Sequence, residues 1–223
     1  MKPFVIILVA LILILPGEDS YASQTETQDS LKGYYHMLSQ FWGELYARGG
    51  ETLYCGKNFG RHKGSEINAE HVFPMAWVAY TLKCGRRHQC RRNNTSFRAI
   101  ETDMHNIWPA RKDVNSARRS YRPAMIKGEH YEFDRCDFEI NDSKRMMEPR
   151  PAVRGEIARS MFYMHDRYDL YLKPELVRLL KKWNRQDPPN SEEHRRNKMI
   201  ESLQGNRNRF IDQHNLIDSL DNQ

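Results

Sequence analysis

The sequence lacks the short motifs that mark several large classes of hydrolase. It has no G-x-S-x-G turn for a nucleophilic serine, no glycine-rich P-loop for a nucleotide, and no H-E-x-x-H zinc helix. Each of these motifs places a nucleophile, a phosphate cradle or a pair of metal ligands in a defined geometry. Serine hydrolase, nucleotide hydrolase and zincin mechanisms therefore have no support in this chain.

Long apolar runs are scarce, and the mean hydropathy is −0.82. The apolar segment from Phe4 to Leu15 is shorter than the roughly 20 residues of a transmembrane helix. It follows Lys2 and precedes Ser20-Tyr21-Ala22, the pattern of a cleaved secretory signal. We expect a signal peptide over residues 1–22, a mature domain over 23–223, no membrane association, and a periplasmic or secreted location.

Acidic residues are missing from one long stretch, and basic residues fill it. No Asp or Glu lies between His71 and Ile100, and a second basic cluster follows. The basic residues of the two stretches are Lys83, Arg86, Arg87, Arg91, Arg92 and Arg98, then Arg111, Lys112, Arg118, Arg119 and Arg122. Loss of Lys2, Glu18 and Asp19 with the signal raises the formal net charge from +6 to +7. A solvated charged face explains either cluster alone, but two clusters around an acidic-histidine motif favour phosphate binding.

Cysteine is rare, with four in the chain. An even number in an exported protein indicates two disulfides, and spacing alone allows three pairings of Cys55, Cys84, Cys90 and Cys136. A zinc site built from Cys84, His88 and Cys90 is a weaker alternative, because export oxidises thiols and the spacing matches no common zinc pattern.

Apolar periodicity predicts helices near both ends of the chain. The segments with helical spacing are 31–46, which ends at Gly49-Gly50, then 153–168, then 174–183, and a last helix capped by Ser191. Residues 52–142 have short mixed runs and many turn formers, which indicate a few short strands and at least one helix. We expect one mainly helical α+β domain. A domain of this size buries its own core, so we expect a monomer with no obligate protein partner.

Two stretches contain residues suited to phosphodiester hydrolysis. They are EHVFPMAW, which begins at Glu70-His71, and ETDMHNIWPA, which begins at Glu101 and is followed by Asp113-Val114-Asn115. The reaction needs a base for water, and a neutral histidine serves near pH 7. It also needs a divalent cation and a group to hold the phosphate. Glu70, His71, Arg87 and Asn115 supply these residue types.

Local geometry leaves structural alternatives open. Adjacent residues of a regular strand point to opposite faces, so Glu70 and His71 share a site only at a strand end or an irregular turn. Pro74 makes a strand end plausible. Asn115 falls in a helix expected from about Pro109 to Arg119, where asparagine is ordinarily a tolerated surface residue. A buried glutamate beside a histidine is also commonly a structural pair.

The ordered set of motifs resembles the endonuclease I family of bacterial periplasmic and secreted nucleases. The resemblance runs from Tyr54-Cys55-Gly56 to about residue 208 and includes EHVFPMAW, ETDMHNIWPA, DVN at 113–115 and RPAVRGEIARSMFYMHDRY at 150–168. It implies a ββα-metal (His-Me finger) core. It also implies that His71 activates water, that Glu70 and Asn115 hold a single Mg²⁺, and that Arg87 binds the phosphate, with Arg86 as the neighbouring candidate. Glu101 matches an acidic residue near the family's site, and the implied disulfides are Cys84–Cys90 and Cys55–Cys136.

The resemblance further implies non-specific cleavage of duplex and single-stranded DNA, and of RNA, to 5′-phosphate products. Such breadth follows if the protein holds the sugar-phosphate backbone and leaves the base edges unread. Two rival functions remain at this stage. A basic exported protein could coat nucleic acid without cutting it, and an exported zinc hydrolase could use cysteine and histidine ligands.

Overall fold

The computed structural model describes residues 32–128 and 132–220, which begin with a helix rich in aromatic side chains. Residues 32–40 are helical and continue into a π-helical turn, η1 (Phe41–Leu45), as predicted for the described part of 31–46. The proposed signal peptide lies outside the described residues. Gly49 then adopts a φ of +88°, where a Cβ would lie 2.1 Å from the carbonyl oxygen of Phe59. That close approach requires glycine and turns the chain into the first hairpin, β1 (Gly50–Glu51) and β2 (Asn58–Phe59).

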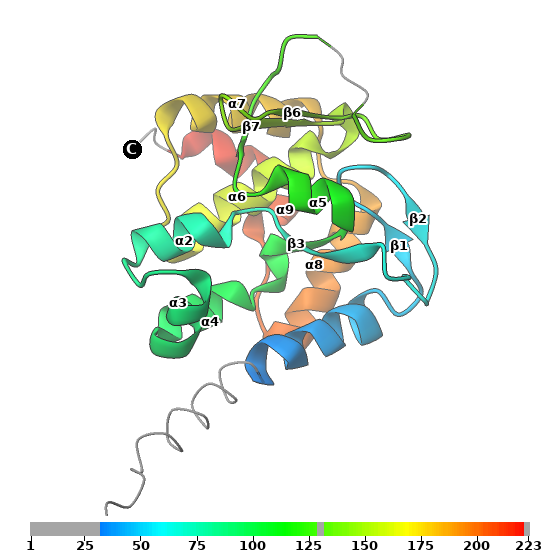
Figure 1. The fold of residues 1–223 in the computed structure, drawn as a ribbon, viewed down its shortest axis with the longest axis vertical. Helices are drawn as coiled ribbons and strands as arrows, with labels where there is room; N and C mark the ends of the chain where they lie inside the picture. Colours follow the sequence, from blue (N-terminus) through cyan, green and yellow to red (C-terminus); the bar gives the residue numbers. More distant parts are fainter. Residues whose placement is uncertain (1–31, 129–131, 221–223) are drawn as a thin grey trace, which may run out of the picture.

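An antiparallel strand pair lies at the centre of the molecule. β3 (Ile67–His71) pairs with β4 (Ile107–Arg111), with Ile67 opposite Arg111 and His71 opposite Ile107. Helix α5 (Lys112–Arg118) follows β4 without a loop. The prediction that this helix begins near Pro109 is wrong, because Pro109 and Ala110 lie in the ladder of β4. The pair and α5 lie beside each other in Figure 1.

Three short helices and one 3₁₀ turn fill the interval between β3 and β4. They are α2 (Met75–Thr81), α3 (Arg87–Asn93), α4 (Thr95–Glu101) and η2 (Met104–Asn106). Asn94 caps α4 by accepting from the backbone N–H of Phe97 at 2.8 Å, and Asp103 caps η2 through the N–H of His105. The segment thus leaves the central strand pair after His71 and returns to it at Ile107.

A three-stranded sheet lies beyond α5, with strands in the order β5 (Arg122–Pro123), β7 (Met146–Pro149) and β6 (Phe138–Asn141). β7 runs parallel to β5 and antiparallel to β6. The disulfide Cys55–Cys136 ties this region to the segment that precedes β2. The combination of small sheets and helices confirms the predicted α+β class.

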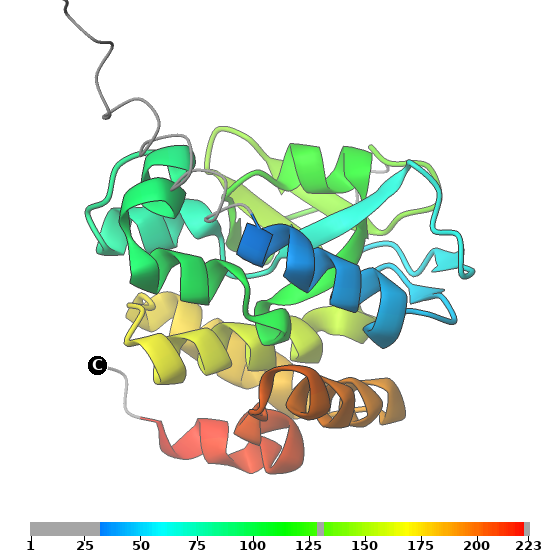
Figure 2. The same ribbon diagram turned by 90° about the horizontal axis from the view of Figure 1, so that it is seen from below.

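Helices make up the rest of the chain and lie together on one side of the molecule (Figure 2). They are η3 (Pro151–Val153), α6 (Arg154–Tyr168), α7 (Pro174–Gln186), α8 (Ser191–Gln204), α9 (Arg209–Asp212) and η4 (His214–Ser219). The predicted stripe of α6 is buried at Ile157, Met161 and Met164. Among the described residues, no helix is both long and apolar enough to span a bilayer.

The predicted cap of α8 is wrong by one residue. Asn190, not Ser191, accepts the N–H of Glu193 at 3.0 Å, and the carboxylate of Glu193 returns to the N–H of Asn190. This reciprocal pair is a capping box, which satisfies two helix-end donors at once. Ser191 is consequently the first residue inside the helix.

A buried arginine joins α8 to the central strand pair. Arg196 is 2% exposed, and its guanidinium donates to the carbonyl oxygens of Met104 and Ile107 at 3.2 and 2.9 Å. The same group lies 3.8 Å from the ring centroid of Trp108 and donates to the hydroxyl of Tyr46. These contacts attach the start of β4 to a helix almost ninety residues later in the sequence.

Candidate active site

His71 is the last residue of β3, and its imidazole is 6% exposed. The Nε2 atom lies 2.9 Å from the backbone carbonyl oxygen of Glu101. A carbonyl oxygen only accepts hydrogen bonds, so Nε2 carries the proton and Nδ1 keeps the lone pair. The contact from the end of α4 therefore fixes the tautomer in which Nδ1 accepts a proton.

The surroundings of His71 favour its neutral form. Burial lowers the pKa of His71 to about 4, and the positive charge of Arg87 acts in the same direction. The ring of Tyr34, from the N-terminal helix, stacks on the imidazole with centroids 6.3 Å apart and an interplanar angle of 18°. At neutral pH the imidazole is thus uncharged and held between the N-terminal helix and α4, as a general base requires.

Glu101 holds two arginines on its carboxylate while its backbone orients His71. The side chain is 1% exposed, and it accepts from Arg87 Nε at 2.6 Å and from Arg91 Nε and Nη2 at 2.6 Å each. Burial alone would raise the pKa of Glu101, but the two guanidinium groups hold it below its ordinary value. The acidic residue is therefore ionised, and it positions the arginine side chains beside the histidine.

The side chain of Glu70 has other side-chain partners than the imidazole of His71, as alternation along a strand requires. Its Oε1 accepts from the Tyr54 hydroxyl at 2.8 Å and lies 3.1 Å from Arg118 Nη1. Burial raises the pKa of Glu70, and the Arg118 charge opposes that rise. Arg118 also donates to the carbonyl oxygen of His71 at 3.2 Å, and it is 1% exposed. The prediction that Arg118 belongs to a surface cluster that binds phosphate is therefore wrong.

Asn115 lies on α5 and faces β3. Its Nδ2 donates to Asn68 Oδ1 at 2.9 Å and to the carbonyl oxygen of Ala69 at 3.4 Å. These two bonds commit the amide nitrogen to the protein, so Oδ1 is the amide atom suited to a cation.

The donor set on β3 and α5 fits a hard divalent cation. The contacts from Tyr54 and Arg118 both fall on Oε1 of Glu70, and a carboxylate has a second oxygen. Asn115 adds an amide oxygen. Within residues 32–128 and 132–220, no three His, Cys, Asp or Glu side chains gather as a metal cluster. Mg²⁺ needs no such cluster, because it keeps several waters and takes one or two protein oxygens.

Two cavities meet at Arg87. One, of about 500 Å³, is lined by His71 together with Arg86, Arg87, Arg118 and Arg119. The other, of about 490 Å³, is lined by Tyr34, Asn68, Arg87 and Asn115, among others. Arg87 borders both spaces, whereas Arg86 borders only the first. Of the two candidate phosphate ligands, Arg87 is thus the one that lies between His71 and Asn115.

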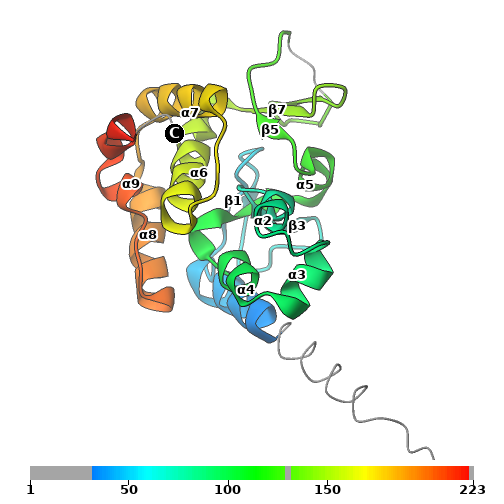
Figure 3. The same cartoon turned by 90° about the vertical axis from the view of Figure 1, so that its left-hand side faces the viewer.

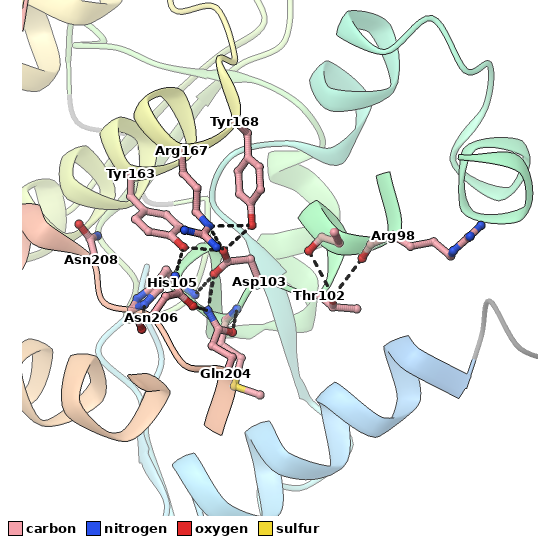
Figure 4. Close-up of polar contacts among 12 residues, drawn as sticks. Arg98, Thr102, Asp103, His105, Tyr163, Arg167, Tyr168, Gln204, Asn206 and Asn208 are labelled. Atoms are coloured by element: carbon pink, nitrogen blue, oxygen red, sulfur yellow. Dashed lines mark hydrogen bonds and ion pairs between the residues drawn. The ribbon is translucent and has the colours of Figure 1, made fainter. Parts of the chain in front are cut away.

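A polar network surrounds Asp103, two residues after Glu101 in the sequence (Figure 4). Asp103 Oδ2 accepts from the hydroxyls of Tyr163 and Tyr168 at 2.6 and 2.7 Å. Its Oδ1 accepts from the N–H of His105 at 3.0 Å and from Gln204 Nε2 at 2.8 Å. The network ties the turn after Glu101 to α6 and to the end of α8, so it fixes the carbonyl that orients His71.

The structure forms both disulfides that the resemblance implied. The sulfur atoms of Cys84–Cys90 are 2.02 Å apart and those of Cys55–Cys136 are 2.12 Å apart. The zinc alternative is therefore wrong, because the bond consumes both thiols that would have ligated the metal. Arg86 and Arg87 lie inside the small loop that Cys84–Cys90 closes, which fixes the start of α3.

Sequence reasoning missed three residues of this site: Tyr34, Tyr54 and Arg91. Tyr34 belongs to a helix that was predicted from apolar spacing alone, and Tyr54 precedes a cysteine with no local pattern around it. Arg91 had a usable signal, because it follows Arg87 by four residues on a helix and therefore shares its face.

Comparison with known proteins gives a consistent result. A sequence model described as Endonuclease I matches residues 19–215. A periplasmic deoxyribonuclease of Aeromonas hydrophila is 32% identical over 202 residues, which cover 80% of this chain and 85% of the relative. An extracellular deoxyribonuclease of the same organism is 29% identical over 95% of this chain and 97% of its own. An extracellular ribonuclease of Bacillus amyloliquefaciens is 37% identical over 53% of this chain and 46% of its own.

Proposed function

This chain belongs to the endonuclease I family of nucleases, and from that premise we propose that it is an exported, metal-dependent, non-specific endonuclease with His71 as general base. The observation that carries the mechanism is the bond from His71 Nε2 to the carbonyl oxygen of Glu101, which leaves Nδ1 as the basic atom. The low pKa of His71, about 4, keeps that atom unprotonated at neutral pH.

We infer that β3, β4 and α5 form a ββα-metal core. The antiparallel pair supplies His71 and Glu70 from one strand, and α5 follows the second strand with Asn115 on the side that faces β3. Three helices are inserted between the strands, so the motif is continuous in space and interrupted in sequence.

In the proposed reaction, Nδ1 of His71 removes a proton from water, and the water oxygen forms a bond to phosphorus. The bond from phosphorus to the 3′ oxygen breaks, and the 3′ oxygen takes a proton from solvent. The products carry a 5′-phosphate and a 3′-hydroxyl. Proton transfer by a well-placed side chain of this kind contributes about 10²- to 10⁴-fold to a rate.

Glu70 and Asn115 would hold one Mg²⁺ through oxygen atoms. When bound, the cation offsets negative charge on the phosphate and on the leaving 3′ oxygen. Arg118 and Tyr54 keep the Glu70 carboxylate in place, and Asn68 keeps the Asn115 amide in place. The chain's own contribution is therefore an oriented pair of oxygen ligands on rigid elements.

Arg87 would hold the non-bridging oxygens of the phosphate, because it borders the cavities of both His71 and Asn115. Glu101 fixes its Nε, and the outer nitrogens of the guanidinium remain to meet an anion. Arg86 is the neighbouring candidate on the His71 side only.

We propose duplex and single-stranded DNA and RNA as substrates. The relatives named deoxyribonuclease and ribonuclease support both sugars. Recognition through phosphates carries no sequence information, which accounts for non-specific cleavage. Relatives named periplasmic and extracellular, together with two disulfides, support export after removal of residues 1–22. The mature domain, residues 23–223, would act as a monomer.

The test is digestion of supercoiled plasmid and of RNA by the oxidised mature protein, with Mg²⁺ or with EDTA. We expect nicking that EDTA abolishes and that His71→Ala reduces by about 10²-fold or more. Arg87→Ala should lose more activity than Arg86→Ala, which is its matched control. Binding without cleavage in a folded protein would instead favour a non-catalytic basic nucleic-acid-binding protein.

A further inference from the structure

A cavity separate from the two at Arg87 lies between α2, the connection from α6 to α7, and the edge of the three-stranded sheet. Its volume is about 440 Å³, within the range of small-molecule sites. Figure 3 shows these three parts on the same side of the molecule. We call it the tyrosine cavity, after Tyr80 and Tyr171, which line it.

The two tyrosines are among the most exposed large hydrophobic residues of the described chain. Tyr80 at the end of α2 is 85% exposed, and Tyr171 before α7 is 61% exposed. Neither ring contributes to the core, so core packing does not explain them. Phe73 and Trp77 also line the cavity, and the Trp77 ring is fixed by its bond from Nε1 to the Ser120 carbonyl oxygen at 3.1 Å.

Positive charge surrounds this aromatic surface. Arg122, Lys144, Arg145 and Lys173 line the cavity, against one carboxylate, that of Glu175. Across residues 32–128 and 132–220, none of these four cations forms an ion pair with a carboxylate. A cavity with aromatic faces and uncompensated cations matches a nucleotide, whose base stacks and whose phosphate is anionic.

The tyrosine cavity adjoins the cavity of His71. Ser120 lines both, and α2 supplies Met75, Ala76 and Ala79 to one and Trp77 and Tyr80 to the other. A strand whose scissile phosphate lies at Arg87 can therefore continue over Ser120 into the tyrosine cavity.

We propose that the tyrosine cavity is an accessory substrate site that stacks an unpaired nucleobase of single-stranded nucleic acid next to the scissile phosphate. Bases in a duplex are already stacked and cannot enter, so the site selects single strands and frayed ends. The inference rests on the proposed function for the identity of the polymer. Its position would make it a determinant of substrate preference, in a protein whose phosphate contacts alone do not distinguish single strands from duplexes.

The experiment measures binding in EDTA, where the proposed nuclease cannot cut. The probe is a short, fluorescently labelled deoxythymidine oligonucleotide, with a matched set in which a single base is removed at each position in turn. Stacking of one base is worth about 5- to 150-fold in affinity. We expect one abasic position to weaken wild-type binding within that range.

The double variant Tyr80→Ala/Tyr171→Ala should bind the intact probe as weakly as the wild type binds that abasic probe. Removal of the same base from the probe should not weaken binding to the double variant further. Tyr80→Phe/Tyr171→Phe keeps the rings and should restore wild-type behaviour. Arg122→Ala/Arg145→Ala should instead weaken intact and abasic probes alike and reduce the slope of log affinity against log salt by about 1.4. Thermal unfolding checks that each variant folds, which the exposure of both tyrosines favours.

Equal affinity of the wild type for every abasic probe, or unchanged binding by the alanine variant, would overturn the inference. Either result leaves plasmid cleavage in Mg²⁺ untouched. Failure of the proposed function would appear in that cleavage assay, so the two failures are distinguishable.

Discussion

Substitution of Asp103 tests whether the network behind Glu101 stabilises the site. The carboxylate accepts four hydrogen bonds, and the two oxygens face different kinds of donor. Oδ2 faces the hydroxyls of Tyr163 and Tyr168, which can accept as well as donate. Oδ1 faces the N–H of His105 and the amide of Gln204, which at these positions only donate.

This asymmetry predicts different costs for two substitutions of similar size. In Asp103→Asn, the amide oxygen can keep the two N–H donors and the amide nitrogen can donate to the hydroxyl oxygens, but the hydroxyl proton of buried Tyr163 loses its acceptor. The loss is then one buried donor, about 1–3 kcal/mol. In Asp103→Leu, Tyr163, which is 3% exposed, and the buried N–H of His105 lose their acceptor. At about 1–3 kcal/mol for each buried donor, the cost is roughly 2–6 kcal/mol.

The assay is urea unfolding of the oxidised protein, followed by tryptophan fluorescence, with plasmid nicking measured on the folded variants. We expect the smaller loss of stability, and near-normal activity, for Asp103→Asn. For Asp103→Leu we expect a large loss of stability and a lower rate, because the Glu101 carbonyl that orients His71 loses its support. Equal stabilities for the two variants would refute the reasoning, since it depends on unsatisfied donors and not on charge.

Three further predictions concern buried groups and cross-links. Burial and two neighbouring carboxylates raise the pKa of Glu156 to about 8, so the free energy of unfolding should fall by up to about 1.4 kcal/mol per pH unit between pH 4.5 and 8. Glu156→Gln should flatten that slope in urea unfolding measured across this pH range, and an unchanged slope would assign the pH dependence to another group. Arg118→Met should destabilise the fold by about 3–5 kcal/mol, because it leaves the buried charge of Glu70 without its partner. Adding Glu70→Gln should recover part of that loss in a double-mutant cycle, and strictly additive losses would contradict the pairing. Replacement of Cys55–Cys136 by alanines should lower the free energy of unfolding by about 4.5 kcal/mol, and replacement of Cys84–Cys90, which closes a shorter loop, by about 2.4 kcal/mol. Equal losses in chemical unfolding would exclude loop entropy as the cause.

The long amphipathic helices were predictable because their patterns extend over several turns. α6 and α7 begin within a residue or so of the predicted starts, at an apolar stripe and at Pro174. The helices between β3 and β4 were not resolved individually, because each has seven residues, too few for a periodic signal. α3 illustrates the difficulty: its sequence RHQCRRN has no apolar face, and a disulfide and Glu101 hold it instead.

The candidate residues of the site were found from their types, but their relations needed the fold. A sequence shows that Glu70 and His71 are adjacent. The structure shows that their side chains contact different partners, Arg118 for the carboxylate and the Glu101 carbonyl for the imidazole. Charge clusters in a sequence carry no information about burial, which is why Arg118 was placed with the surface cations. Tyr34 stacks on a histidine 37 positions away, and nothing local to either residue records that contact.

The attachment of β4 to α8 has a consequence for the timing of folding. Arg196 bonds the carbonyl of Ile107 across 89 positions of sequence. At a synthesis rate of about 5–20 residues per second, the ribosome makes β4 roughly 4–18 s before it makes Arg196. During that interval the segment that orients His71 lacks both its buried cation and the amide of Gln204. A growing chain therefore completes the support of this site only after Arg196 and Gln204 have been made.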